Sequence, residues 1–138
     1  MNPWMYNGEI FKEQDSEGWL GFVYVIHNLV DDKKYIGKKL FFHKGHRQVK
    51  GKKKKALKVS DWMSYMGSSN DLLEDIKKHG EDCFTREIIH LCRTKGETSY
   101  LEAREQFNND ALLKPNKYYN SIVNLRCSRI HLPKDMLI

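Results

Sequence analysis

Hydrophobic residues in the first third of the chain form a pattern that predicts a β-hairpin. Residues 21–28 are mostly aromatic or β-branched, which is typical of a strand. A short polar segment follows, and its adjacent aspartates suit a turn because their side chains can hydrogen-bond to nearby backbone. Residues 35–37, Tyr-Ile-Gly, then form a second, short strand. The predicted hairpin covers about residues 21–38 and carries Tyr24 and Tyr35, one on each arm.

A first helix is predicted from Asn70 to His79 by its apolar positions and its end residues. Ser68 or Ser69 can cap its amino end, and Gly80 suits the position after its last turn. Acidic residues come early in this helix and basic residues late, which matches the helix dipole.

A strand and a second helix are predicted further along the chain. Residues 84–91 read as a strand, and the helix runs from Glu97 to about Leu113, where it stops before Pro115. Thr94 and Glu97 have the spacing of a capping box. The resulting order of strand, strand, helix, strand and helix predicts an α/β fold, in which helices pack on a small sheet.

The remaining segments show weaker patterns. Residues 1–20 contain scattered aromatics without a sustained period, so we expect a loosely structured N-terminal arm that packs some of these aromatics onto the domain. Residues 38–58 are strongly basic and contain two glycines, which predicts a long loop rather than one helix. Residues 121–130 have strand-like apolar residues. We therefore expect an arm at 1–20, one domain at 21–130 and a tail at 131–138.

Length and hydropathy lead us to expect an intracellular protein. Its 138 residues suffice for one hydrophobic core, and 40% of them are apolar. No apolar run approaches the roughly 20 residues that span a bilayer. The first residues lack the basic-then-apolar pattern of a signal peptide.

Charge is distributed unevenly along the chain. Residues 33–60 contain twelve Lys or Arg and no acid, which leaves twelve basic residues against eighteen acidic ones elsewhere. A local excess of this kind attracts an anionic polymer, although a solvated loop would also explain it. A membrane surface is less favoured, because the basic run has little apolar surface to insert. The candidate nucleic-acid-binding residues are Lys38, Lys44, Lys50, Lys52, Lys53, Lys54, Lys55 and Lys58.

The second predicted helix contains two candidate carboxylates. On a helical wheel, Tyr100, Ala103 and Phe107 share one face. Glu105 falls at the edge of that face, whereas Glu102 points further out. We therefore expect Glu105 to be half-buried and Glu102 to be an ordinary surface residue.

Several of these segments together resemble the GIY-YIG nucleases. Residues 22–24, Phe-Val-Tyr, resemble the first half of that signature, and residues 35–37 match the second half letter for letter. Residues 102–107 resemble the context of the family's metal-binding glutamate, and Tyr119-Asn120 resembles its aromatic-asparagine pair. The resemblance covers about residues 21–122. It implies a three-stranded mixed sheet flanked by helices.

The resemblance also implies roles for individual residues. Glu105 would hold a divalent ion, Mg²⁺ or Mn²⁺, for hydrolysis of DNA phosphodiester bonds. Tyr24 would act as general base or orient the water, with Tyr35 as its partner. Gly37 and Asn120 would support the local fold.

The chain departs from the family at the catalytic cation. An arginine usually lies about eight residues after the motif glycine, and here that position is Gly45. Lys39 and Arg47 are the candidates to replace it. The Tyr-Ile-Gly-Lys-Lys variant resembles a phage-type subgroup, which implies the cytoplasm of an infected bacterial host.

Two alternatives to a nuclease remain open at this point. The missing arginine is compatible with a catalytically inactive nucleic-acid-binding domain on the same fold. The basic segment is also compatible with a regulatory protein that binds an acidic partner. The expected partners are otherwise DNA and, as an open alternative, a second copy of the chain, with no membrane and no small-molecule cofactor.

Overall fold

A five-stranded sheet forms the centre of the computed structural model, which describes the backbone of residues 1–49 and 52–138 and the side chains of residues 1–43 and 58–138. The strand order within these residues is β2-β1-β7-β3-β4, and every pairing is antiparallel except that of β1 with β7. The strands are β1 (Trp4–Tyr6), β2 (Glu9–Ile10), β3 (Gly21–Asn28), β4 (Lys33–Leu40) and β7 (Phe84–Cys92). The α/β class is confirmed, but the sheet exceeds the three strands that were predicted.

The predicted hairpin is confirmed as the pair β3 and β4. Tyr24 lies opposite Gly37, and Ile26 lies opposite Tyr35. Asn28 stabilises the turn, because its side-chain oxygen accepts hydrogen bonds from the backbone N–H groups of Val30 and Asp31. The turn therefore depends on the last residue of β3 as well as on the aspartates.

The N-terminal arm packs aromatic residues onto the domain as predicted, but the prediction that it is loosely structured is wrong. β1 adds to the sheet beside β7, and the Trp4 side chain is only 2% exposed. Its indole N–H donates a hydrogen bond of 2.8 Å to the backbone oxygen of Trp62. A strand of three residues is too short to show an alternating pattern in the sequence. The burial of Trp4 is therefore a result of the tertiary structure.

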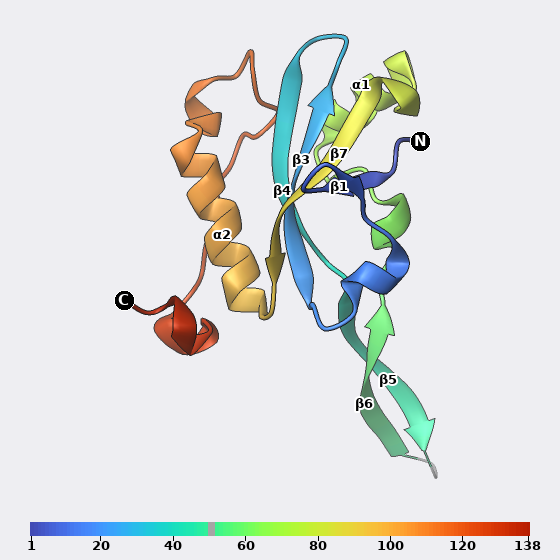
Figure 1. The fold of residues 1–138 in the computed structure, drawn as a ribbon, viewed down its shortest axis with the longest axis vertical. Helices are drawn as coiled ribbons and strands as arrows, with labels where there is room; N and C mark the ends of the chain where they lie inside the picture. Colours follow the sequence, from blue (N-terminus) through green and yellow to red (C-terminus); the bar gives the residue numbers. More distant parts are fainter. Residues whose placement is uncertain (50–51) are drawn as a thin grey trace.

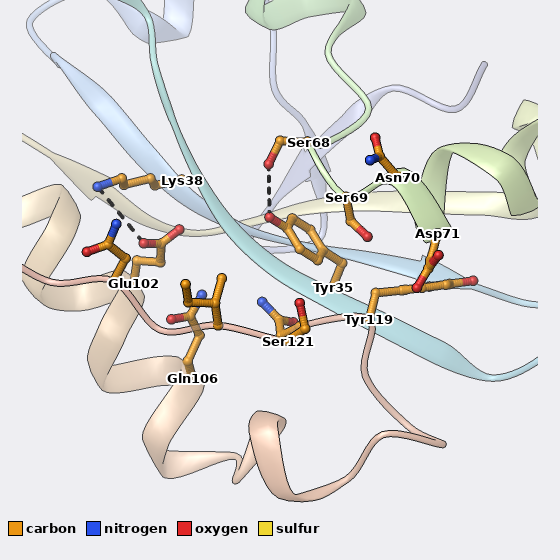
Figure 2. A pocket seen from close by; sticks show the side chains of 13 residues that line it. Tyr35, Lys38, Ser68, Ser69, Asn70, Asp71, Glu102, Gln106, Tyr119 and Ser121 are labelled. Atoms are coloured by element: carbon orange, nitrogen blue, oxygen red, sulfur yellow. Dashed lines mark hydrogen bonds and ion pairs between the residues drawn. The ribbon is translucent and has the colours of Figure 1, made fainter.

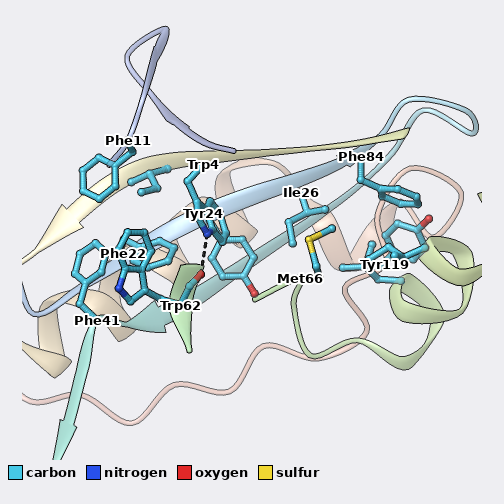
Figure 3. Packing of buried hydrophobic residues seen from close by; sticks show 13 residues of the cluster. Trp4, Phe11, Phe22, Tyr24, Ile26, Phe41, Trp62, Met66, Phe84 and Tyr119 are labelled. Carbon is cyan, nitrogen blue, oxygen red and sulfur yellow. Dashed lines mark hydrogen bonds between the residues drawn. The ribbon is translucent and has the colours of Figure 1, made fainter. Parts of the chain in front are cut away.

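Helices cover both faces of the sheet (Figure 1). On one face, Phe22, Tyr24 and Ile26 of β3 share a core with α1 (Asn70–His79). On the other face, Val23 of β3 packs with Leu101 of α2 (Lys95–Asn108). Because successive side chains of a strand point to opposite faces, β3 is buried on both sides and reads as a continuous apolar run. Figure 3 shows the larger of the two cores.

Both predicted helices are present, with one difference in length. The Ser69 hydroxyl caps α1 by accepting a hydrogen bond from the Leu72 backbone N–H, and Thr94 caps α2 in the same way. α2 ends at Asn108 because Asp110 adopts a left-handed conformation with φ of 51°. A 3₁₀ turn at Ala111–Leu113 follows instead of further α-helix. Residues 121–130 form no strand, contrary to expectation.

The prediction of a long basic loop is also wrong. The backbone pairs as an antiparallel hairpin of β5 (Phe42–Val49) and β6 (Lys52–Val59), which projects away from the rest of the chain (Figure 1). Phe41, fully buried at the base of this hairpin, joins it to the core. The segment is poor in the β-branched and aromatic residues that identify strands, so its pairing could not be predicted from composition.

No helix in the described residues is long and apolar enough to cross a bilayer.

Candidate active site

The edge strand β4 presents alternate side chains to the two faces of the sheet. Tyr35 and Lys39 share the face of Ile26 and Phe22, which α1 covers. Lys38 shares the face of Val23, which α2 covers. The two consecutive lysines therefore have different surroundings, because neighbouring residues of a strand point in opposite directions.

The segment after α2 covers the outer edge of β4. The backbone N–H of Lys34 donates to the Lys117 oxygen, and the Tyr119 N–H donates to the Lys34 oxygen. Further along the strand, the Asn120 side chain accepts from the Ile36 N–H and donates to the Ile36 oxygen. Asn120 thus occupies the edge of the sheet as a further strand would.

A polar pocket of about 560 Å³ wraps around this edge, between the amino end of α1 and the middle of α2. Figure 2 shows its side chains projecting from β4, from both helices and from the segment beyond α2. The lining residues are Tyr35, Lys38, Ser68, Ser69, Asn70, Asp71, Glu102, Gln106, Tyr119, Asn120, Ser121, Ile122 and Asn124.

Tyr35 brings a phenol to this pocket. Its hydroxyl lies 3.1 Å from the Ser68 hydroxyl, just before the start of α1 (Figure 2). Burial raises the pKa of Tyr35 above its ordinary value, and the hydrogen bond with Ser68 partly opposes this rise. In the absence of a nearby cation, Tyr35 is therefore a neutral phenol.

Glu102 is one of two acidic residues that line the pocket, and the other, Asp71, lies in the first turn of α1. The Glu102 side chain is 14% exposed, and one carboxylate oxygen lies 4.0 Å from the Lys38 ammonium. Burial raises the pKa of Glu102, while the charge of Lys38 acts in the opposite direction. Lys38 also donates a hydrogen bond of 2.8 Å to the Ser99 hydroxyl, which fixes its ammonium beside α2.

The expectation that Glu102 is an ordinary surface residue is wrong. Glu105 is half-buried as expected, at 23% exposed, but it lies 2.8 Å from His90 of β7 and does not line the pocket. The prediction assumed that Tyr100 and Phe107 mark the buried side of the helix, but Phe107 is 61% exposed. The side of α2 that faces the sheet includes Thr98 and Gln106, which hydrogen bonds allow to be buried.

Gln106 lies one helical turn after Glu102 and has an unusual side-chain oxygen. The side chain is 5% exposed, and its N–H group donates to the Ile36 oxygen. Its Oε1 has no hydrogen-bond partner among the described residues. A buried acceptor without a partner is costly, so an amide oxygen in the wall of this pocket indicates a donor or a cation as ligand.

Tyr24 is in the core and does not line the pocket. It is 1% exposed, and burial raises its pKa well above the ordinary value. The centre of its ring lies 6.2 Å from that of Tyr35, and its hydroxyl lies where a Cβ on Gly37 would stand. The motif glycine is thus required by the close approach of the other motif tyrosine.

The predicted cations separate in the structure. Lys39 lies 2.6 Å from Asp61, and its ammonium sits 4.2 Å from the centre of the Tyr65 ring. Lys38, predicted to bind nucleic acid, is instead the lysine that lines the pocket. Lys58 is exposed in β6. The side chains of Lys44, Arg47 and Lys52–Lys55, together with all of Lys50, lie outside the described residues.

A second group of possible metal ligands lies at the β3–β4 turn. Atoms of Asp31, Asp75 and His79 lie within 4.8 Å of one another. His79 is 3.0 Å from Asp31, and the Tyr119 hydroxyl donates to Asp75 at 2.6 Å. These polar atoms partner one another, so the group joins the turn to α1 as a hydrogen-bond network.

Comparisons with known proteins identify relatives of this chain. A family model described as "Putative endonuclease segE, GIY-YIG domain" matches residues 4–123. The chain is 33% identical over 99 residues to a protein of Enterobacteria phage T4 named "Putative endonuclease segE". The aligned part covers 72% of this chain but only 39% of that relative. No solved structure matches the chain.

Proposed function

The chain belongs to the GIY-YIG endonuclease family of the segE type, and from this premise we propose that it is a metal-dependent endonuclease that hydrolyses DNA. The observation that carries the proposal is the convergence of Tyr35, Lys38 and Glu102 in one pocket. These three side chains supply the groups that phosphodiester hydrolysis requires: a proton acceptor, a fixed positive charge and a metal ligand.

Glu102 is the residue that we propose to hold the metal ion. GIY-YIG nucleases generally depend on a divalent metal, and Mg²⁺ or Mn²⁺ suits a site with one carboxylate and several waters. The unpartnered Oε1 of Gln106 supports this assignment, because it offers a second oxygen to the ion or to a water bound to it. When bound, the ion would polarise the phosphate and stabilise the leaving oxygen. Glu105, the sequence-based choice, already has His90 as its partner.

Tyr35 is the proposed proton acceptor. Its hydroxyl lines the pocket, whereas that of Tyr24 is enclosed by the core. A nearby cation lowers the pKa of a phenol, so Tyr35 can take the proton of the attacking water when the pocket is loaded. Tyr24 then has a supporting role, which is to set the packing of Tyr35 and Gly37.

Lys38 is the proposed cation that neutralises charge on the reacting phosphate. The hydrogen bond to Ser99 and the distance of 4.0 Å to Glu102 position its ammonium in the pocket wall. A fixed positive charge stabilises a transition state in which the phosphate becomes more negative. Lys39 is held by Asp61 and Tyr65 and supports the opposite face of β4.

A non-catalytic DNA-binding domain is the second candidate. It is favoured by the position of Gly45, where the family's arginine would be expected, within strand β5. Nicking of supercoiled plasmid in the presence of Mg²⁺ or Mn²⁺, with EDTA as control, distinguishes the two. Metal-dependent nicking that Glu102→Gln removes supports the nuclease. DNA binding with no nicking in either metal supports the second candidate.

A further inference from the structure

A second groove lies beside the candidate active site, between β4 and the amino end of α2. It has a volume of about 370 Å³ and shares Lys38 with the active-site pocket. Lys38 therefore stands in the wall between the two. The groove is lined by Lys38, Lys39, Leu40, His43, Ser60, Lys95, Thr98 and Ser99.

Among the described residues that line this groove, the ionisable ones are Lys38, Lys39, His43 and Lys95, and none is acidic. The ammonium of Lys39 is already paired, so Lys38 and Lys95 are the lysines that a ligand of the groove would meet. Asp61 contacts Lys39 at 2.6 Å but is not part of the lining. Because the Ser99 hydroxyl accepts from Lys38, its own proton remains available to a further acceptor. The groove thus offers positive charge and a hydroxyl donor to an oxyanion.

Lys95 is the residue whose position is hardest to explain by folding alone. It is the first residue of α2, where the positive end of the helix dipole disfavours a cation. Its side chain is exposed, and no ion pair joins it to a carboxylate among the described residues. An anion bound in the groove beside Lys95 and Lys38 would be attracted by both lysines and would offset the unfavourable position of Lys95 on the helix.

We propose that this groove binds a backbone phosphate of the DNA, next to the phosphate that is cleaved in the Tyr35–Glu102 pocket. The inference rests on the proposed function for the identity of the ligand. It also assigns a direction to the strand, because His43 of the groove lies at the base of the β5/β6 hairpin. The DNA strand would pass from the pocket, through the groove, towards that hairpin.

The first test measures binding of a fluorescent 20-base-pair duplex in EDTA, so that no cleavage is involved. Lys95→Ser is compared with the parent over a salt titration, and Lys77→Ser, an exposed lysine on α1, is the matched control. A plot of log affinity against log salt concentration has a negative slope, and removal of one lysine–phosphate interaction makes this slope shallower by roughly 0.9. We expect this change for Lys95→Ser and the parent slope for Lys77→Ser.

The second test locates the phosphate. Single neutral methylphosphonate linkages are placed one at a time around the mapped cleavage position, and each substrate is bound to the parent and to Lys95→Ser. If Lys95 contacts one phosphate, neutralising that linkage weakens the parent's binding but changes Lys95→Ser little, which a double-mutant cycle reports as coupling. We expect coupling at a linkage within about two nucleotides of the cut, on one side only.

Opposite results would overturn the inference. The inference fails if Lys95→Ser binds DNA with the same salt dependence as the parent, or if no linkage near the cut shows coupling to Lys95. A chain that binds DNA with the expected Lys95 dependence but never cuts would contradict the proposed nuclease and leave the groove as a phosphate site. Cleavage with no Lys95 dependence would contradict only the groove.

Discussion

The Lys38 ammonium lies 4.0 Å from the Glu102 carboxylate, across the contact between edge strand β4 and helix α2. This distance places an acid and a base of opposite charge in the wall of one pocket, although 64 positions separate them in the sequence. The sequence had pointed instead to Glu105 as the metal ligand and to Lys39 or Arg47 as the catalytic cation. The pocket therefore differs from the predicted site in both its acid and its cation.

Glu102→Gln is expected to reduce metal-dependent cleavage by at least about a hundredfold, since it removes the proposed ionic ligand while keeping the shape of the side chain. Single-turnover cleavage of plasmid in Mg²⁺ measures the effect. Glu105→Gln is the matched control, because Glu105 pairs with His90 instead. If Glu105→Gln is inactive and Glu102→Gln still cleaves DNA, Glu105 is the metal ligand, as the sequence predicted.

Tyr35→Phe is expected to slow the cleavage step at least about tenfold, on the scale of general acid–base effects, with a near-normal melting temperature. Tyr24→Phe should have a smaller effect on rate, because the Tyr24 hydroxyl lies in the core and not in the pocket. The measurement is the single-turnover rate at saturating protein, with thermal melting of both variants. Equal losses of rate would show that the buried hydroxyl also takes part.

The free energy of unfolding should depend on whether Glu102 is protonated, ionised or bound to a metal ion. Because burial raises the folded-state pKa of Glu102, its contribution to stability is complete below the unfolded pKa and is lost as pH rises through the folded pKa. In EDTA, Glu102→Gln should therefore gain stability relative to the parent as pH rises from the ordinary glutamate pKa of about 4.3 through the higher folded-state pKa.

Mg²⁺ at neutral pH should reverse this difference, because the ion binds the charged form. At a hundredfold excess over its dissociation constant, the ion stabilises the parent by about 2.7 kcal/mol and should leave Glu102→Gln unchanged. Chemical denaturation with and without Mg²⁺ measures both effects. The assignment fails if the two proteins respond equally to the ion.

Gly37→Ala is expected to destabilise the fold by about 1–3 kcal/mol, because the added methyl group would meet the Tyr24 hydroxyl and ring. In combination with Tyr24→Phe, part of the loss should be recovered, since the oxygen is removed while the ring remains. Denaturant unfolding of the single and double variants tests this coupling. Strict additivity would indicate that the glycine is required for another reason.

Replacement of residues 52–55 by serine is expected to weaken binding to all DNA sequences about equally, because lysines contact phosphates without reading bases. The negative slope of log affinity against log salt concentration should become shallower by up to roughly 0.9 for each phosphate that the variant no longer neutralises. The rate at which bound DNA is cleaved should change little. Lys38→Ala should behave in the opposite way, with a slower cleavage step and a smaller decrease in binding. A four-serine variant with the parent salt slope would identify the hairpin as a solvated element.

Local structure was largely predictable from the sequence. The β3–β4 hairpin, the caps at Ser69 and Thr94, and strand β7 were all predicted close to their observed bounds. Each depends on interactions within a few residues, such as a side-chain cap or the alternation of a strand. The family resemblance also came from such short, spaced motifs, and the comparisons confirm it.

The pairing of the shorter and more basic segments was decided by tertiary structure. β1 is held by a parallel partner 82 positions away, as Trp4 beside Arg86 shows, and its own three residues have no recognisable period. The β5/β6 hairpin is held by backbone hydrogen bonds that its lysine-rich sequence does not reveal. The partner of β1 is distant in the sequence, whereas β5 and β6 are neighbours whose composition gives no strand signal.

The composition of the candidate site was decided in the same way. The family resemblance seen in the sequence implied that a tyrosine hairpin, a following lysine and a helix with two glutamates contribute to one site. It could not determine which tyrosine, lysine or glutamate would face the pocket. The lysine and the tyrosine are selected by their positions on β3 and β4. The glutamate is selected by the rotation of α2 against the sheet, in which Thr98 and Gln106 are buried with hydrogen bonds and Phe107 is exposed. A hydrophobic wheel cannot detect this rotation, because a polar side chain can be buried wherever the rest of the fold supplies its hydrogen-bond partners.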